Sequence, residues 1–181
     1  MLTPLIPSLI VASGGKKWVK VGAHPGPLAG GVEVFRGVTH LALDNKGRLA
    51  IPARHREALA RQAEGRLIVT ADPSHCLLLY PLLAWEPIEH RLMGLSSFNE
   101  ETRALQRLLV GHADDVVLDG AGRILVPPAL RQYAALEKRV VLVGQGNKFE
   151  LWDEAKWLEQ TEHAVAFPAG GLPPELDGFS L

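Results

Sequence analysis

The hydrophobic and polar positions of the chain alternate in short runs from about residue 35 onward, and turn-forming residues separate these runs. Apolar side chains alternate from Val38 to Leu43, a polar turn spans residues 44–47, and residues 48–51 form a returning strand. Period-two alternation around Asp, Asn and Gly is typical of a β-hairpin, because these residues accept tight-turn dihedral angles. Pro52 suits the first turn of a helix, which we expect to reach about Ala60.

The same patterns predict the elements of the rest of the chain. Two apolar runs, Leu67–Ala71 and Cys76–Tyr80, flank a turn at residues 72–75, and Pro81 opens a helix. Ser97 and Glu100 have the spacing of a capping box, which predicts a helix up to about Val110. Beyond it we expect strands 113–119 and 122–126, helix 127–135, strands 139–144 and 148–152, and helix 153–165.

One phrase occurs twice in the sequence. Residues 44–52 read DNKGRLAIP and residues 119–127 read DGAGRILVP, which is an offset of 75. The similarity continues, because Tyr80 and Trp85 correspond to Trp152 and Trp157 at an offset of 72. A repeat of this kind indicates one supersecondary unit used twice. We therefore predict an α+β protein of two similar halves, residues 38–85 and 113–157, joined by a connecting helix within residues 86–112.

The two ends of the chain lack such patterns. Residues 1–33 are rich in Gly and Pro and have no basic residue before their apolar stretch, so they are unlike a secretory signal. We expect a disordered leader there, and a flexible tail over residues 166–181, where Pro and Gly are again frequent.

Composition narrows the class of protein. The chain has 181 residues, 47% of them hydrophobic and 22% charged, with a net charge of −1, as in ordinary globular proteins. The lone Cys76 excludes a disulfide framework, and its apolar setting predicts a buried thiol. The seven His residues lack metal-ligand spacing, no nucleophile motif follows His112, and we expect neither an enzyme nor a cofactor.

Several stretches of this sequence resemble the MraZ family of bacterial regulators. They are residues 35–37 (FRG), 44–48 (DNKGR), 77–81 (LLLYP), 106–109 (QRLL), 119–123 (DGAGR) and 144–152 (GQGNKFELW). The resemblance covers about Val34 to Trp157. It implies tandem pseudo-symmetric swapped-hairpin halves of the AbrB/SpoVT β-barrel type with packed helices, ring-shaped homo-oligomers, and repression of the protein's own division and cell-wall operon through G-rich direct repeats.

The residues of the repeated phrase are compatible with that function. An Arg on a two-stranded ribbon can enter the major groove of double-stranded DNA and contact guanine, and a neighbouring carboxylate would orient it. We predict that Arg48 and Arg123 contact bases, that Lys46 contacts phosphate, and that Asp44 and Asp119 orient the arginines. Gly47 and Gly122 shape the turns, and further backbone contacts are predicted for three neighbouring side chains, Arg36, Arg54 and Arg56.

Alternatives to this interpretation remain open. Each Asp–Arg pair can instead be an ion pair that stabilises its hairpin without a ligand. The second copy has Ala121 in place of Lys46, so it can be mainly architectural. The protein can also be a ring-forming interaction protein that acts on a partner protein. As a DNA-binding regulator it would act in the cytoplasm, associated with the nucleoid.

Val34 occupies the position at which family members have their initiating Met. Because a GTG codon can start translation, we expect that Val34 is the native start. The codons of residues 17–19 and of Val21-Gly22 can each spell GTGGG, about one helical turn of DNA apart. Such repeats resemble the operators of the family, and the nucleotide sequence would test both expectations.

Overall fold

A computed structural model describes residues 34–96 and 98–165 of the chain and has an α+β architecture. Its strands are β1 (Phe35–Ala42), β2 (Arg48–Ala50), β3 (Arg66–Ala71), β4 (Leu77–Pro81), β5 (Asp114–Val117), β6 (Arg123–Leu125), β7 (Arg139–Gly146) and β8 (Phe149–Asp153). Its helices are α1 (Ala53–Ala63), α2 (Leu82–Met93), α3 (Glu100–Leu109), α4 (Pro128–Tyr133) and α5 (Glu154–Val165). The predicted order of strands and helices is confirmed for these ranges, whereas the predicted leader and tail lie outside the described residues.

The strand order has a pseudo-two-fold pattern. The described strands form a six-stranded sheet in the order β1-β7-β8-β4-β3-β5 and a two-stranded sheet of β2 and β6. All the pairings are antiparallel. If β1, β3 and β4 are exchanged with their sequence counterparts β5, β7 and β8, the order simply reverses. The repeat in the sequence therefore corresponds to a repeat in the sheet.

The two halves exchange strands. The strands β1 and β2 pair with β7 and β6 of the second half, and β5 pairs with β3 of the first. Apart from the hydrogen bonds of its turn, the first hairpin has a single bridge between its own strands, Leu43 with Leu49. A hairpin that leaves its own half in this way cannot complete its hydrogen bonding alone, so the two halves form one structural unit.

The main core lies where the two halves meet. Leu49, Ile51, Ile124 and Val126, two from each copy of the repeated phrase, are fully buried together with apolar residues of the six-stranded sheet. Phe35 packs on Phe149 with ring centroids 4.3 Å apart. Cys76 is buried as predicted, and so are Trp85 and Trp152.

The ends of the helices refine three predictions. Pro52 and Pro81 have extended dihedral angles and stand immediately before α1 and α2, not inside their first turns. The predicted cap of α3 was wrong, because Oδ1 of Asn99 accepts hydrogen bonds from the backbone N–H groups of Glu101 and Thr102. Asn99 has the same capping chemistry as a serine and lies directly before the helix. Ser97 itself lies outside the described residues.

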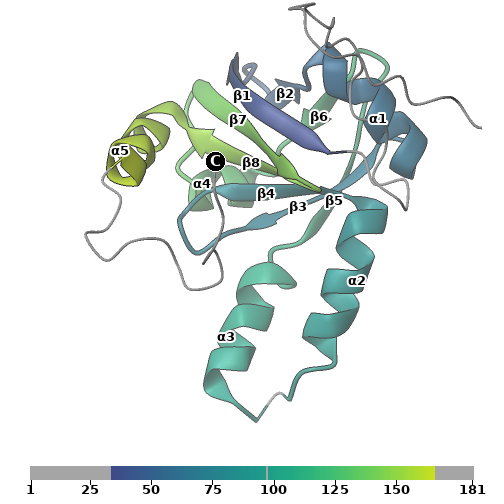
Figure 1. The fold of residues 1–181 in the computed structure, drawn as a ribbon, viewed down its shortest axis with the longest axis vertical. Coiled ribbons are helices and arrows are strands. Elements are labelled where there is room, and N and C mark those ends of the chain that lie inside the picture. The colour runs from purple at the N-terminus through teal and green to yellow at the C-terminus, as the bar shows by residue number, and fades with distance from the viewer. Residues whose placement is uncertain (1–33, 97, 166–181) are drawn as a thin grey trace, which may run out of the picture.

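The α2–α3 pair extends away from the sheet, on the side opposite to β2 and β6 (Figure 1). Its tip carries exposed apolar residues, among which Phe98 is 95% exposed. Across the described ranges, no helix combines the length and the apolar character needed to cross a membrane.

Candidate nucleic-acid interface

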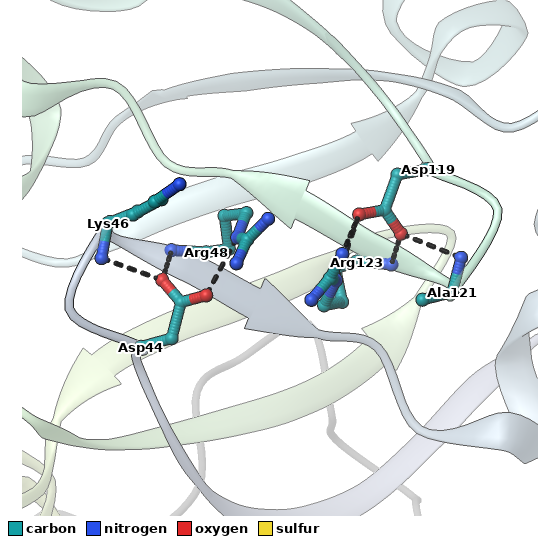
Figure 2. A network of polar contacts seen from close by, with 6 residues as sticks. All are labelled: Asp44, Lys46, Arg48, Asp119, Ala121 and Arg123. Atoms are coloured by element: carbon teal, nitrogen blue, oxygen red, sulfur yellow. Dashed lines mark hydrogen bonds and ion pairs between the residues drawn. The ribbon is translucent and has the colours of Figure 1, made fainter.

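The first copy of the repeated phrase folds into a turn organised by Asp44 (Figure 2). Its Oδ1 accepts hydrogen bonds from the backbone N–H groups of Lys46 and Arg48, both at 2.9 Å. Nε of Arg48 donates to Oδ2 of Asp44 at 2.7 Å. The N–H group of Gly47 donates to the carbonyl oxygen of Asp44 at 2.8 Å. One carboxylate therefore holds both the backbone of the turn and the guanidinium.

The second turn repeats this arrangement around Asp119 (Figure 2). Its Oδ1 accepts from the backbone N–H groups of Ala121 and Arg123, both at 2.9 Å. Nε of Arg123 donates to Oδ2 at 2.9 Å, and Nη2 of Arg123 lies 2.7 Å from the same oxygen. The guanidinium of Arg123 is thus held through two nitrogen atoms. The aspartate accepts the same backbone and side-chain hydrogen bonds in both turns, so the repeated phrase encodes one local structure.

These contacts change the acidity of both carboxyl groups. The backbone N–H of Arg48 makes the largest contribution to lowering the pKa of Asp44 to about 2. For Asp119 the guanidinium of Arg123 contributes most, and the pKa is again lowered to about 2. The hydrogen bond to Asp119 in turn raises the pKa of Arg123, with a smaller contribution from Asp44 of the other turn. Both acids are therefore ionised at neutral pH.

The strands β2 and β6, hereafter the ribbon, have one buried and one exposed face. Leu49 pairs with Ile124, and both side chains are fully buried. Because side chains alternate along a strand, their neighbours Arg48, Ala50, Arg123 and Leu125 share the opposite face. Arg48 and Arg123 thus project from the exposed face on either side of the pseudo-two-fold centre, each oriented by its own carboxylate.

Each turn is also covered by an arginine from the other half. Arg56 of α1 packs against Gly122, and its Nε donates to the carbonyl oxygen of Ile51 at 2.6 Å. Arg131 of α4 packs against Gly47, where an added Cβ would lie 2.6 Å from its Cζ, and its Nε donates to the carbonyl oxygen of Val126 at 3.1 Å. Sequence reasoning missed Arg131, although the offset of 75 from Arg56 could have indicated it.

The other predicted basic residues lie in two places. Lys46 lies at the first turn, and its backbone N–H is bonded to Asp44 (Figure 2). Arg54 lies over β1, because its Nη2 donates to Oγ1 of Thr39 at 2.6 Å. Arg36 is exposed near the start of β1, opposite Gln145. The structure therefore brings Arg56 to the turns with Lys46, Arg48 and Arg123, whereas Arg36 and Arg54 lie along β1.

A shallow hollow of about 370 Å³ adjoins the second turn and is lined in part by Arg56, Gly65 and Asp119. Over the ranges that the structure describes, no group of three or more His, Cys, Asp or Glu side chains could hold a metal ion. The features that recur in both halves are instead an ionised acid, an oriented arginine and a second arginine above a glycine turn. The fold and the site thus define a strand-exchanged α+β protein with oriented arginines on an exposed ribbon, and guanidinium groups presented in this way can donate hydrogen bonds to an anion.

Comparison with known proteins specifies the family. The family model described as "MraZ protein, putative antitoxin-like" matches residues 34–108 and 109–169. "Transcriptional regulator MraZ" of Nitrosospira multiformis is 66% identical over 148 residues, which cover 82% of this chain and all of that protein. The proteins of the same name from Nitrosomonas eutropha and Shewanella baltica are 59% and 55% identical, over 82% and 73% of this chain and 100% and 88% of theirs. The chain belongs to the MraZ family, which confirms the resemblance seen in the sequence.

Proposed function

We propose that this protein is a transcription regulator that binds double-stranded DNA in a sequence-specific manner, through G-rich direct repeats. The observation that carries the proposal is the exposed face of the ribbon, where Arg48 and Arg123 are held by Asp44 and Asp119. The major groove is about 12 Å wide and admits a two-stranded ribbon. An oriented guanidinium can donate two parallel hydrogen bonds to O6 and N7 of guanine, whereas a freely rotating one would first have to be ordered.

The remaining basic residues would hold the DNA backbone in this proposal. Lys46 extends from the turn next to Arg48, where a flexible ammonium group suits a phosphate oxygen. Arg56 and Arg131 flank the two turns and have further N–H groups besides those bonded to backbone carbonyls. Arg36 and Arg54 along β1 would extend the contact to neighbouring phosphates.

The proposal includes the assembly and the biological role. We infer that the exchanged hairpins close as barrels of the AbrB/SpoVT type, and that subunits associate into a ring that reads adjacent repeats. The regulated gene cluster would be the protein's own division and cell-wall operon, which it would repress in the cytoplasm at the nucleoid. The names of the relatives support a role in transcription, since they are called transcriptional regulators.

Replacement of Arg48 tests the site. The probe is a duplex with two GTGGG repeats one helical turn apart, and the comparison is a scrambled duplex of equal composition, measured by fluorescence anisotropy at two salt concentrations. Arg48→Ala should remove the preference for the repeats and lose about 1–3 kcal/mol for each base contact. Lys46→Ala should weaken binding to both duplexes alike and reduce the salt slope by about one unit.

Arg91→Ala is the matched control, because Arg91 is an exposed arginine on α2, which projects away from the ribbon. It should retain the affinity and the preference of the unaltered protein. An Arg48→Ala protein that still discriminated between the two duplexes would contradict the proposed function.

A second candidate function is that of a ring-forming interaction protein that acts on a partner protein rather than on DNA. The exposed apolar residues at the tip of the α2–α3 pair, Met93, Leu95 and Phe98, favour a protein contact at that end of the molecule. Unaltered DNA binding by Arg48→Ala, together with loss of assembly by Phe98→Ser, would favour this second function.

A further inference from the structure

Leu125 is an apolar residue on the exposed face of the ribbon. Its side chain is 52% exposed, whereas Ile124 and Val126 beside it are fully buried. The equivalent position in the first half, 75 residues earlier, is Ala50. The exposed face thus carries two arginines and one large apolar side chain, and that side chain belongs to the second half.

The register places Leu125 directly opposite Arg48. On one side of the pair Arg48–Leu125, the N–H of Val126 donates to the carbonyl oxygen of Gly47. On the other side of the pair, Leu49 faces Ile124. Bonded and non-bonded pairs alternate in antiparallel strands, so Arg48 and Leu125 form a non-bonded pair, whose Cα atoms are about 4.5 Å apart. Their side chains are therefore close neighbours on one surface.

This juxtaposition suits one feature of the major groove. Adjacent base pairs are separated by about 3.4 Å along the helix. The Cα atoms of Arg48 and Leu125 are separated by a similar distance of about 4.5 Å, so a leucine beside a guanine-bound Arg48 can reach the neighbouring base pair. The apolar group that a base edge offers in the major groove is the C5-methyl of thymine, and aliphatic side chains contact it.

We propose that Leu125 contacts the C5-methyl group of a thymine next to the guanine read by Arg48, and so determines specificity at that base pair. The inference rests on the proposed function of the ribbon. It also gives the pseudo-symmetric ribbon a direction, because Arg123 faces Ala50, whose single methyl group cannot reach as far. The first turn has Lys46 where the second has Ala121, so the end of the ribbon that carries Arg48 and Leu125 also carries the additional positive charge. A directional ribbon suits direct repeats better than palindromic ones.

A second copy of the chain is a poorer occupant of this face than DNA. Leu125 lies opposite Arg48 and two residues from Arg123 on the same face, and an apolar protein surface there would have to remove water from both arginines. A polyanion with an apolar methyl group in its groove satisfies the cations and the leucine together.

Exchange of thymine for deoxyuridine, which lacks only the methyl group, tests the inference. Each thymine on either strand of the GTGGG-repeat duplex is replaced in turn, and affinity is measured by fluorescence anisotropy. The unaltered protein should lose about fourfold in affinity at one thymine position for each methyl group removed. Leu125→Ala should bind the thymine and deoxyuridine duplexes equally. Leu83→Ala, which alters an exposed leucine of α2, should retain the fourfold difference.

Three outcomes would overturn the inference. The unaltered protein could be indifferent to deoxyuridine at every position, or Leu125→Ala could keep the full difference. Thirdly, light scattering could show that Leu125→Ala changes the mass of the assembly, which would assign Leu125 to a contact between subunits. Failure of the proposed function would give a different result from failure of this inference: Arg48→Ala would then leave the preference for the repeats intact.

Discussion

Each Asp–Arg pair of the repeated phrase has a structural role, and we propose that it also serves in recognition. The carboxylate of Asp44 accepts two backbone N–H groups as well as the guanidinium, so the pair holds the turn even without a ligand. An exposed ion pair on its own stabilises a protein very little. The additional backbone bonds explain why the acid is Asp, whose short side chain can reach back to its own turn.

We predict that the free energy of unfolding depends on pH through Asp44 and Asp119. The folded-state pKa of Asp44 and Asp119 is about 2, below the ordinary value of 3.8, so the ionised form stabilises the fold. This contribution is complete above about pH 4 and is lost as the pH falls toward 2. In urea unfolding, the Asp44→Asn/Asp119→Asn protein should be less stable than the unaltered protein at pH 6, and the difference should narrow between pH 4 and 2.

Asp114→Asn, on an exposed edge strand, is the control and should leave the unfolding free energy at pH 6 unchanged. A difference between the double variant and the unaltered protein that stayed constant from pH 6 to pH 2 would contradict the assigned role of the two acids.

Among the elements, the ribbon shows how each half depends on the other. The N–H of Ile51 donates to the carbonyl oxygen of Gly122, and that of Val126 donates to Gly47, both at 3.0 Å. Arg56 and Arg131 then cover the same glycines from opposite halves. Each turn is therefore held both by its own aspartate and by an arginine of the other half, so the exposed face of the ribbon depends on both halves.

We predict that substitution by alanine destabilises the protein at Gly122 but not at Gly120, although both glycines belong to one turn. Gly122 has a φ of 71°, and an added Cβ would press on Arg56, whereas nothing lies within 4 Å of a Cβ at Gly120. Gly122→Ala should cost at least about 1–2 kcal/mol of unfolding free energy from the left-handed backbone alone. Gly120→Ala should stay within about 0.5 kcal/mol of the unaltered protein.

A double-mutant cycle separates the two causes. In an Arg56→Ala background the steric contact is absent, so Gly122→Ala should cost less than in the unaltered protein, and the remainder measures the backbone conformation. If Gly122→Ala cost the same unfolding free energy in both backgrounds, Arg56 would move aside without cost and would not hold the turn in place.

The whole molecule has a net charge of −1, so in the proposed function each subunit by itself would be attracted to DNA only weakly. We predict that affinity for tandem sites comes from several subunits reading adjacent repeats, which can raise apparent affinity by roughly 10²–10⁴. Insertion of about five base pairs between the repeats turns one site to the opposite face of the DNA and should abolish the gain. Insertion of about ten base pairs returns the two sites to the same face of the DNA and should recover part of the gain in affinity.

Anisotropy titrations with one repeat, two repeats and the two spaced duplexes provide the measurement. If the protein bound a single repeat as tightly as a pair, or if the five-base-pair insertion had no effect, avidity would not be the source of the affinity.

The amino-acid sequence by itself determined the features that depend on near neighbours. Period-two alternation predicted the strands, and Asp44, Gly47 and Arg48 predicted the turn, because side chain and backbone groups four residues apart meet in any such turn. The cap of α3 was predicted wrongly, since Ser97 and Asn99 both have suitable side chains, and only the path of the chain selects one of them.

Only the tertiary structure decided which residues of the two halves meet. The pairing of β2 with β6, the contact of Arg131 with Gly47 and the exposure of Leu125 opposite Arg48 join segments 73 or more residues apart in the sequence. Sequence alternation assigns a residue to one of two faces, but it cannot say which strand lies alongside or which face is covered. Those outcomes depend on burying the apolar faces of both halves together, a property of the folded chain as a whole.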